Sequence, residues 1–239
     1  MKLKHGAALL LLGTFAMTGY AANAGPAPRW HGVADVRPAA GTAAPAVSAS
    51  PAATDEDLRA ALLGDADVPS GMTPVAMAST RTGKVSIGGG SFPGCPALEP
   101  MTTDETTSAA VTYAAGAVGP YLTHAIVRFP AGGAQDAMAR LRSTTASCRS
   151  FEQQLAGITV RFTVAAADPP AGLGDDAAGL RMTGTTDIGI SVGADIIAVR
   201  RHDYVIWLND TAIGTSPAGL AASAAPAAAA RCGQRLKDC

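Results

Sequence analysis

Three arginines and one histidine are the clearest candidates for chemistry in this sequence. Residues 123–129 alternate between apolar and other side chains, so His124 and Arg128 share one side of an expected β-strand. Arg161 and Arg181 stand on the polar side of two later strands. Guanidinium groups bind carboxylate or phosphate through paired hydrogen bonds. If these strands are neighbours in one sheet, the four side chains gather on the face away from the core and bind an anion. The alternative is an ordinary polar sheet face that contacts water.

Patterns for catalysis are weak by comparison. The expected domain contains only His124 and His202 as imidazole bases, and no Gly-x-Ser-x-Gly nucleophile motif occurs. The adjacent carboxylates Asp175-Asp176 suit a turn or a helix cap better than paired acid and base roles. No Cys-x-x-Cys occurs, so we expect neither a metal site nor a cofactor. A non-enzymatic protein is the leading interpretation. A hydrolase with an unrecognised active site and a structural protein are the alternatives.

Composition limits the classes of partner. The 239 residues carry 18 Lys and Arg against 19 Asp and Glu, for a formal net charge of −1. A nucleic-acid-binding protein needs a basic surface to neutralise phosphates, so this balance argues against that class. Charged residues make up 15% of the chain and hydrophobic residues 48%, which fits a folded domain. No apolar stretch has the length that spans a bilayer.

The N-terminus has the pattern of a secretion signal. A short basic start precedes an apolar run at 7–17, and residues 22–24 form a small-x-small cleavage pattern. These features predict a signal peptide over 1–24, cleaved after Ala24, and therefore a secreted, extracytoplasmic protein. Tyr20 stands where a bacterial lipoprotein signal carries its lipidated cysteine. Because Tyr20 has no thiol, we expect no lipid anchor.

A linker and one domain follow the signal peptide. Residues 25–53 are rich in Ala and Pro and poor in large apolar side chains, which predicts a disordered linker. Residues 54–239 are numerous enough for a single folded domain. The chain has four cysteines, and in an oxidising compartment four cysteines predict two disulfides. Three pairings are possible among Cys95, Cys148, Cys232 and Cys239.

The hydrophobic periodicity predicts three helices and several strands. One helix follows the acidic residues 55–57, and a second spans 134–146. A third begins at Ser216, with Pro217 in its first turn, and is kinked or split at Pro226. Short turns between strands imply antiparallel pairing. We therefore expect an α+β domain with helices packed on one face of an antiparallel sheet. The expected strands are a hairpin of 75–77 with 85–87, then 111–115, 123–129, 158–164, 178–183, 188–192, 195–201 and 204–208.

Five short patterns occur in an order that carries a family resemblance. They are Leu62-Leu63 with Asp67-Val68-Pro69-Ser70-Gly71; Cys95-Pro96-Ala97-Leu98; Phe129 with Cys148 and Phe151; Gly174-Asp175-Asp176-Ala177 with Leu180-Arg181; and the hairpin 196–204. Together they resemble the PknH-like extracellular sensor domain family of actinobacteria, over about residues 58–236. This chain has His202-Asp203 where that family has a Gly-Asn turn.

The resemblance implies a soluble, sensor-like domain with a cleft, an antiparallel sheet and no catalytic residues. It implies a Cys95–Cys148 disulfide, with Cys232–Cys239 as an addition to the family pattern. The ligands of the family are largely unknown. From the arginine face we expect the partner to be a small anionic ligand, or else a protein of the cell envelope. The expected function is a secreted, non-enzymatic, sensor-like binding domain, with a cell-envelope hydrolase and a structural envelope protein as the alternatives.

Overall fold

The computed structural model describes residues 53–82, 95–98, 106–155 and 158–239. The predicted signal peptide, nearly all of the predicted linker and the strand expected at 85–87 lie outside the described residues.

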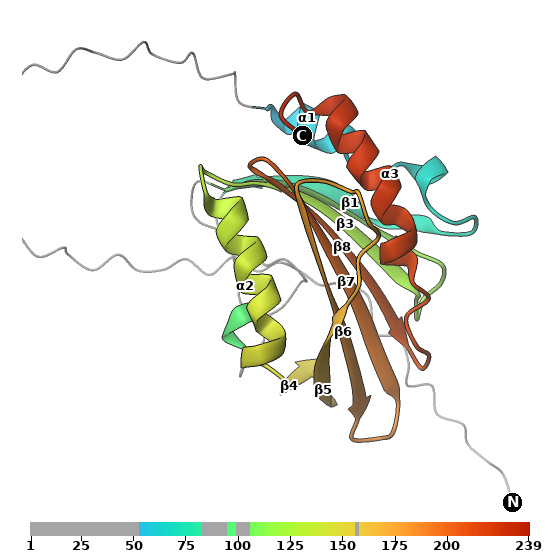
Figure 1. Ribbon diagram of the computed structural model, residues 1–239. Helices are drawn as coiled ribbons and strands as arrows, with labels where there is room; N and C mark the ends of the chain where they lie inside the picture. The colour runs from blue at the N-terminus through green and yellow to red at the C-terminus, as the bar shows by residue number, and fades with distance from the viewer. Residues whose placement is uncertain (1–52, 83–94, 99–105, 156–157) are drawn as a thin grey trace, which may run out of the picture. The chain divides into compact units, whose positions relative to one another are not determined.

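One antiparallel sheet of eight strands organises the fold (Figure 1). Its order is β1-β2-β3-β8-β7-β6-β5-β4, and every neighbouring pair is antiparallel. The strands are β1 Thr73–Thr82, β2 Thr107–Ala114, β3 Tyr121–Arg128, β4 Ser150–Leu155, β5 Ile158–Ala167, β6 Asp176–Thr186, β7 Ser191–Arg201 and β8 Tyr204–Ile213.

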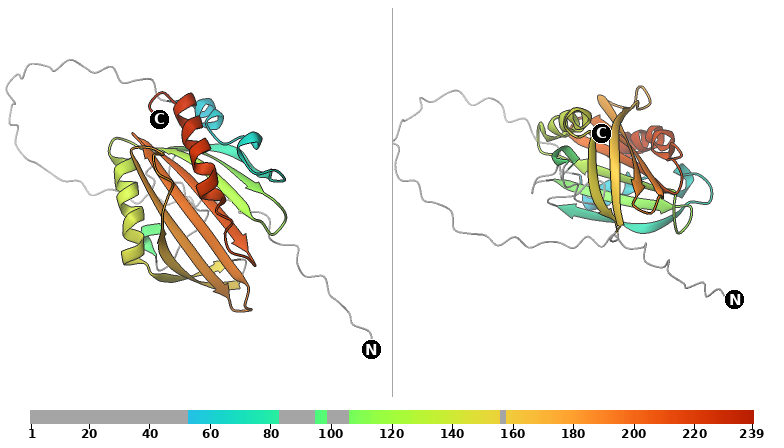
Figure 2. Two further views of the ribbon diagram at one scale, coloured as in Figure 1. Left: turned by 45° about the vertical axis from the view of Figure 1, so that its right-hand side comes forward. Right: turned by 90° about the horizontal axis from the view of Figure 1, so that it is seen from below.

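The helices lie on both faces of the sheet. They are α1 Asp55–Ala60, α2 Gly133–Ser147 and α3 Leu220–Arg235, with 3-10 turns η1 Asp65–Asp67 and η2 Pro96–Leu98. Figures 1 and 2 show α2 and α3 on opposite sides of the strands. Helix α2 packs over one side, which we call the α2 face, whereas α1 and α3 pack over the other, the α1/α3 face.

The expectation that helices pack on one face is therefore wrong. The central strand β8 explains the error, because its apolar run is buried in both directions. Val205 and Trp207 belong to the core under α2, whereas Ile206 and Leu208 belong to the core under α1 and α3. A strand covered on both faces is continuously apolar rather than alternating. That signal was present in the sequence and indicated a sheet covered on both sides.

Most predicted elements are found, with shifted ends. Helix α1 begins at an N-cap, Thr54, which forms a reciprocal capping box with Asp57. Helix α2 matches the expected helix over 134–146. The expected strands at 188–192 and 195–201 are instead one strand, β7, because the chain turns at Gly189 with φ of +83°. Strand β4 was not predicted.

The last helix begins later than expected. Its N-cap is Gly219, not Ser216, because the backbone N–H of Leu220 donates to the Asp210 carboxylate at 2.8 Å. That bond fixes the first turn three residues beyond Pro217. Pro226 lies on the exposed side of α3, and the helix runs through it without being split.

Both disulfides are present. Cys95–Cys148 ties η2 to the C-cap of α2, and Cys232–Cys239 ties α3 to the C-terminal residue. One bridge lies on the α2 face and the other on the α1/α3 face. The pairing agrees with the one that the family resemblance implied.

Another of the resembling patterns fixes a hairpin. The Asp175 carboxylate accepts from the backbone N–H of His202 at 2.7 Å, which lowers the pKa of Asp175. A Cβ on Gly174 would lie 2.5 Å from the carbonyl oxygen of Arg200, so only glycine fits there. His202 has φ of +50°, which explains why glycine or asparagine suits this turn.

Candidate functional site

The α1/α3 face is covered over only part of the sheet. Helix α3 packs against β8, β7 and β3, and α1 packs against β1 and β2. Farther along the same face, the side chains of β5 and β6 are exposed, including Arg161, Thr163, Arg181 and Thr183. An open groove of about 590 Å³ lies over these strands. We call it the hydroxyl-lined groove; its lining is Thr159, Arg161 and Thr163 of β5, residues 183–187, residues 191–193 and residues 215–217.

Strand register builds the floor of this groove. Thr163 pairs with Thr183, and Arg161 pairs with Thr185, across β5 and β6. Thr185 in turn pairs with Ser191 of β7. Residues directly opposite one another project to the same side of a sheet, so these side chains form one surface. The hydroxyls of Thr163 and Thr183 are 2.9 Å apart and hydrogen-bonded.

The loop before α3 forms a wall of the groove. Residues 215–217 pass over β7 at Gly193, where a Cβ would lie 2.5 Å from Cδ of Pro217. Gly193 is therefore required for the loop to lie this close to the sheet. Asp210 holds the same loop from its other end through the N–H of Leu220. The groove is therefore formed by the sheet and by the loops at 187 and 215–217.

Arg161 is the cation of the groove, and its side chain is 76% exposed. Its Nε and Nη2 donate to Oε1 of Glu152, at 3.0 and 2.8 Å. The Glu152 side chain is itself 55% exposed. An ion pair this open to water contributes on the order of 0–1 kcal/mol, so a ligand can displace Glu152 at little cost.

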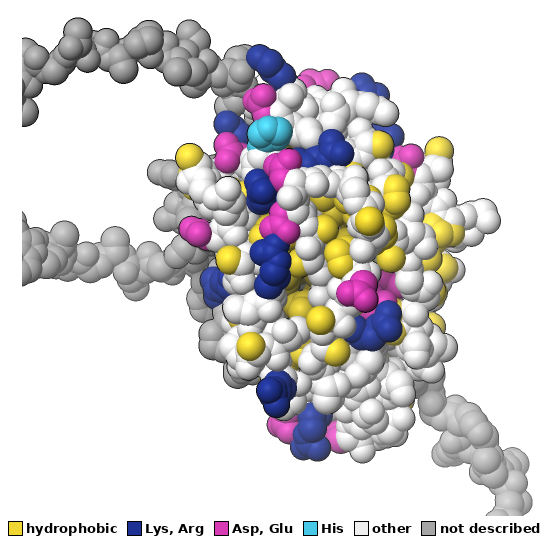
Figure 3. Space-filling view, viewed as in Figure 1, with side chains coloured by type: hydrophobic (Ala, Val, Ile, Leu, Met, Phe, Trp, Pro, Cys, Tyr) yellow, Lys and Arg dark blue, Asp and Glu magenta, His cyan; other side chains and the backbone are white. Residues whose placement is uncertain are grey.

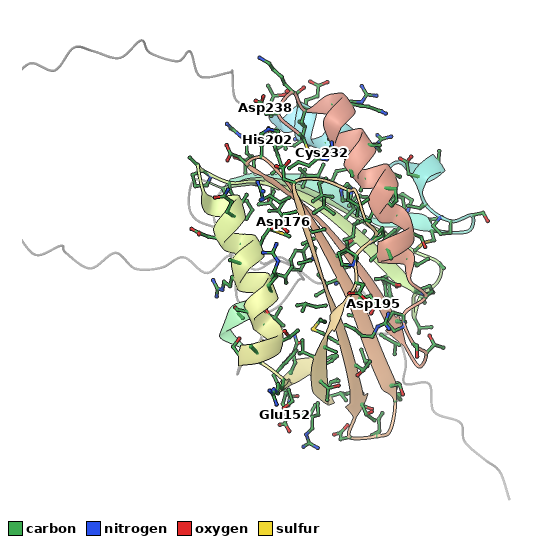
Figure 4. All side chains as sticks on the ribbon, in the orientation of Figure 1. Glu152, Asp176, Asp195, His202, Cys232 and Asp238 are labelled. Atoms are coloured by element: carbon green, nitrogen blue, oxygen red, sulfur yellow. A yellow bond between two sulfur atoms is a disulfide. The ribbon has the colours of Figure 1, made fainter. Side chains whose placement is uncertain are left out.

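Arg181 is held far more firmly. Its Nε and Nη2 donate to the two carboxylate oxygens of Asp195, at 2.7 and 2.6 Å. The Asp195 side chain is only 8% exposed, and these bonds raise the pKa of Arg181. Glu152 and Asp195, the partners of the two arginines, are labelled in Figure 4 at separate positions on the sheet. Arg181 therefore serves to neutralise a buried carboxylate.

The structure separates the other two predicted residues from these arginines. His124 and Arg128 are on β3, and β8, β7 and β6 lie between β3 and β5. All four side chains do share the α1/α3 face, as the register through β8 and β7 shows. However, that face is core wherever the helices cover it. Because β8 and β7 separate β3 from β6 and β5, His124 and Arg128 do not form one cluster with Arg161 and Arg181.

His124 is fully buried under α1 and α3. Its Nδ1 accepts from the backbone N–H of Leu63 at 3.0 Å, which places the ring proton on Nε2. Among the described residues, Nε2 has no hydrogen-bond partner. Burial, and then the charge of Arg231, lower the pKa of His124 to about 3. His124 is therefore a neutral core residue that anchors the Leu63 peptide, whose carbonyl accepts from the Tyr113 hydroxyl at 2.9 Å.

Two carboxylates beside the groove were not predicted from the sequence as site residues. Asp195 and Asp210 stand directly opposite each other on β7 and β8. Burial raises the pKa of Asp210, whereas the N–H of Leu220 acts in the opposite direction. The groove threonines were missed as well. Their signal was the pattern Thr159-x-Arg161-x-Thr163 followed by Thr183-x-Thr185, in which hydroxyls alternate with apolar or small side chains.

Charges on the molecular surface are interspersed. On the face shown in Figure 3, basic and acidic side chains lie beside one another and form no separate basic patch. Within the described ranges, no three His, Cys, Asp or Glu side chains are grouped as a metal site requires. None of the described helices has both the length and the apolar character that crossing a bilayer requires.

The fold and groove define a disulfide-bonded α+β domain with one eight-stranded antiparallel sheet, helices on both faces and one open sheet surface. Among solved structures, this fold is similar to the extracellular domain of PknH from Mycobacterium tuberculosis, with a TM-score of 0.52 and 17% sequence identity. The match covers 76% of this chain and 97% of the other. This likeness is a distant relationship of fold. No protein-family profile matches the chain, and no curated protein matches it either.

Proposed function

We propose that this protein is a secreted, non-enzymatic, sensor-like binding domain of the cell envelope. The observation that carries the proposal is the hydroxyl-lined groove, a hollow on the part of the α1/α3 face where β5 and β6 carry exposed polar side chains. Its volume of about 590 Å³ falls in the range of small-molecule sites. Two disulfides support an oxidising compartment. The fold likeness to an extracellular domain points the same way.

The ligand is proposed to carry an acidic group that binds Arg161. Of the arginines expected from the sequence, Arg161 alone lines the groove. Its exposed partner Glu152 is exchangeable, whereas Arg181 is committed to Asp195. Of the four side chains that the sequence suggested as anion ligands, we therefore retain Arg161 alone. His124 is excluded from direct contact with a ligand by its complete burial.

Burial of His124 also bears on the rival hydrolase. A hydrolytic triad needs an imidazole beside an accessible nucleophile. His124 bonds to the Leu63 backbone beneath two helices, and no histidine is among the residues that line the groove. The described residues therefore support a binding domain over the hydrolase. A groove also distinguishes this surface from the convex one that a purely structural protein would present.

Native mass spectrometry of the protein from its own culture medium tests the proposal. We expect a chain that begins at Gly25, is lighter than its reduced form by four hydrogen atoms, and carries an adduct that dissociates in acid. Arg161→Ala should lose the adduct. Arg142→Ala, which removes an exposed arginine paired with Asp176 away from the groove, should keep it. An adduct retained by Arg161→Ala, or a protein found only in the cytoplasm, would contradict the proposal.

A further inference from the structure

We propose that the hydroxyl-lined groove binds a saccharide that carries a single carboxylate, with Arg161 on the carboxylate and the groove hydroxyls on the sugar hydroxyls. This inference rests on the proposed function and names its ligand class. It starts from the chemistry of the lining: eight of the groove residues are Thr or Ser. A hydroxyl both donates and accepts hydrogen bonds, so a dense set of hydroxyls best matches a ligand that does both.

Several of these hydroxyls are available. Thr185, Ser191, Thr215 and Ser216 are exposed, and their side chains bond to no other group among the described residues. Thr185 and Ser191 project side by side from β6 and β7, and Thr215 and Ser216 come from the wall. A ligand between floor and wall can therefore be bound from both sides. A pyranose ring presents hydroxyls around its whole edge, which fits this arrangement.

Strand positions argue against a peptide as the ligand. An extended peptide adds to a sheet through the unpaired backbone of an edge strand. The groove lies over β5, β6 and β7, each of which has a neighbour on both sides. Thr159, Arg161 and Thr163 of β5 are paired with both β4 and β6, or with β4 and the turn that follows β6. Recognition on the floor of the groove must use side chains, because the backbone groups of these strands are already bonded.

Charge limits the ligand to one acidic group. Among the described residues that line the groove, Arg161 is the one cation and Asp187 is an anion, and Glu152 lies against Arg161. A polyanion would meet repulsion from both carboxylates, whereas a single carboxylate can replace Glu152 on the guanidinium. The planar fork of Arg161 already holds a carboxylate, so the exchange needs no new geometry. Asp187 remains free to accept from sugar hydroxyls.

Three matched probes test the inference by amide chemical-shift mapping of the whole mature protein. Cellobiouronate has hydroxyls and a carboxylate, cellobiose has hydroxyls alone, and tetrahydropyran-2-carboxylate has the ring and the carboxylate without hydroxyls. We expect shift changes at the groove residues with cellobiouronate, and dissociation constants at least about tenfold weaker for the other two.

Variants assign the contacts. Arg161→Ala should weaken cellobiouronate binding about tenfold or more, and Thr185→Val about fivefold. Glu152→Gln should strengthen it, because the competing carboxylate is gone, while leaving any cellobiose binding unchanged. The matched controls are Arg142→Ala, Asp176→Asn and Thr123→Val. Thr123 is paired with Thr112 at 3.0 Å on the α2 face, away from the groove.

The outcomes separate this inference from the proposed function. Equal binding of cellobiouronate and tetrahydropyran-2-carboxylate would overturn the saccharide and leave an anion site, so the proposed function would stand. Unchanged affinity in Glu152→Gln would overturn the exchange of carboxylates at Arg161. If none of the probes shifts the groove amides, the saccharide inference fails. The adduct found by native mass spectrometry would then decide the proposed function on its own.

Discussion

The two halves of the α1/α3 face are built on the same strand alternation and differ in what covers them. In the covered half, Leu208, Ile206 and His124 are fully buried under α1 and α3. In the open half, Arg161, Thr163 and Thr183 occupy equivalent positions on β5 and β6 and are exposed. Strand alternation therefore determines the face on which a residue lies. The packing of helices determines whether that part of the face is buried core or an exposed surface.

The largest expected effect is on stability, and it separates the two halves. Leu208→Ala removes a fully buried side chain from the covered half and should lower the free energy of unfolding by about 2–5 kcal/mol. Thr185→Val alters an exposed residue of the open half and should stay within about 0.5 kcal/mol. Urea denaturation of both variants measures the difference. Similar losses of unfolding free energy in the two variants would contradict the assigned difference between the covered and the open half.

The next effect is the dependence of stability on pH. The pKa of His124 falls from 6.5 to about 3 on folding, so the unfolded chain binds the extra proton between these values. The stability that neutral His124 contributes is therefore present above pH 6.5 and is lost as pH falls, by about 1.4 kcal/mol per pH unit.

A histidine variant isolates this effect. His124→Gln can still accept from the Leu63 N–H but does not titrate, so its stability should fall less steeply below pH 6.5. Burial raises the pKa of Asp210, so protonation of Asp210 stabilises the fold as pH falls. This effect on stability is opposite in sign to that of His124. The measured quantity is accordingly the difference in slope between wild type and variant. Parallel stability curves from pH 7 to pH 5 would mean that His124 is not buried in solution.

The smallest effect distinguishes the two arginines of the open half. Arg181→Ala leaves the 8% exposed carboxylate of Asp195 without its partner and should cost about 1–3 kcal/mol. Arg161→Ala breaks an exposed pair and should change the free energy of unfolding by less than about 1 kcal/mol. Thermal denaturation of the two variants measures which one loses more stability. A larger loss for Arg161→Ala would reverse the assigned roles of the structural and the ligand-binding arginine.

Sequence patterns predicted the types of most elements and the face on which each side chain lies. They did not predict which parts of each face the helices cover. The alternation at 123–129 placed His124 correctly opposite Val127, and the turn at His202 was confirmed. Whether His124 met water depended on α1 and α3, which are distant from β3 in sequence. Local periodicity carries no information about that contact. The late start of α3 similarly depends on Asp210, a residue of another element.

The candidate site was predicted in part for the same reason. Arg161 was identified from its strand, but Asp195 as the partner of Arg181 required the register of β6 against β7. The groove also needs Gly193 under Pro217, a close approach between segments that no spacing rule connects. Sites formed by three strands and a loop become visible only once the pairing is known.

We assign the covered half of this face to the stability of the fold and propose that the open half binds a ligand. The most direct test is an amide chemical-shift map of the mature protein before and after adding the low-molecular-weight fraction of its own culture medium. We expect shift changes at the groove residues of β5, β6 and β7, and at Thr215 and Ser216, with none around His124. Changes centred on the covered half, or on the α2 face, would contradict it.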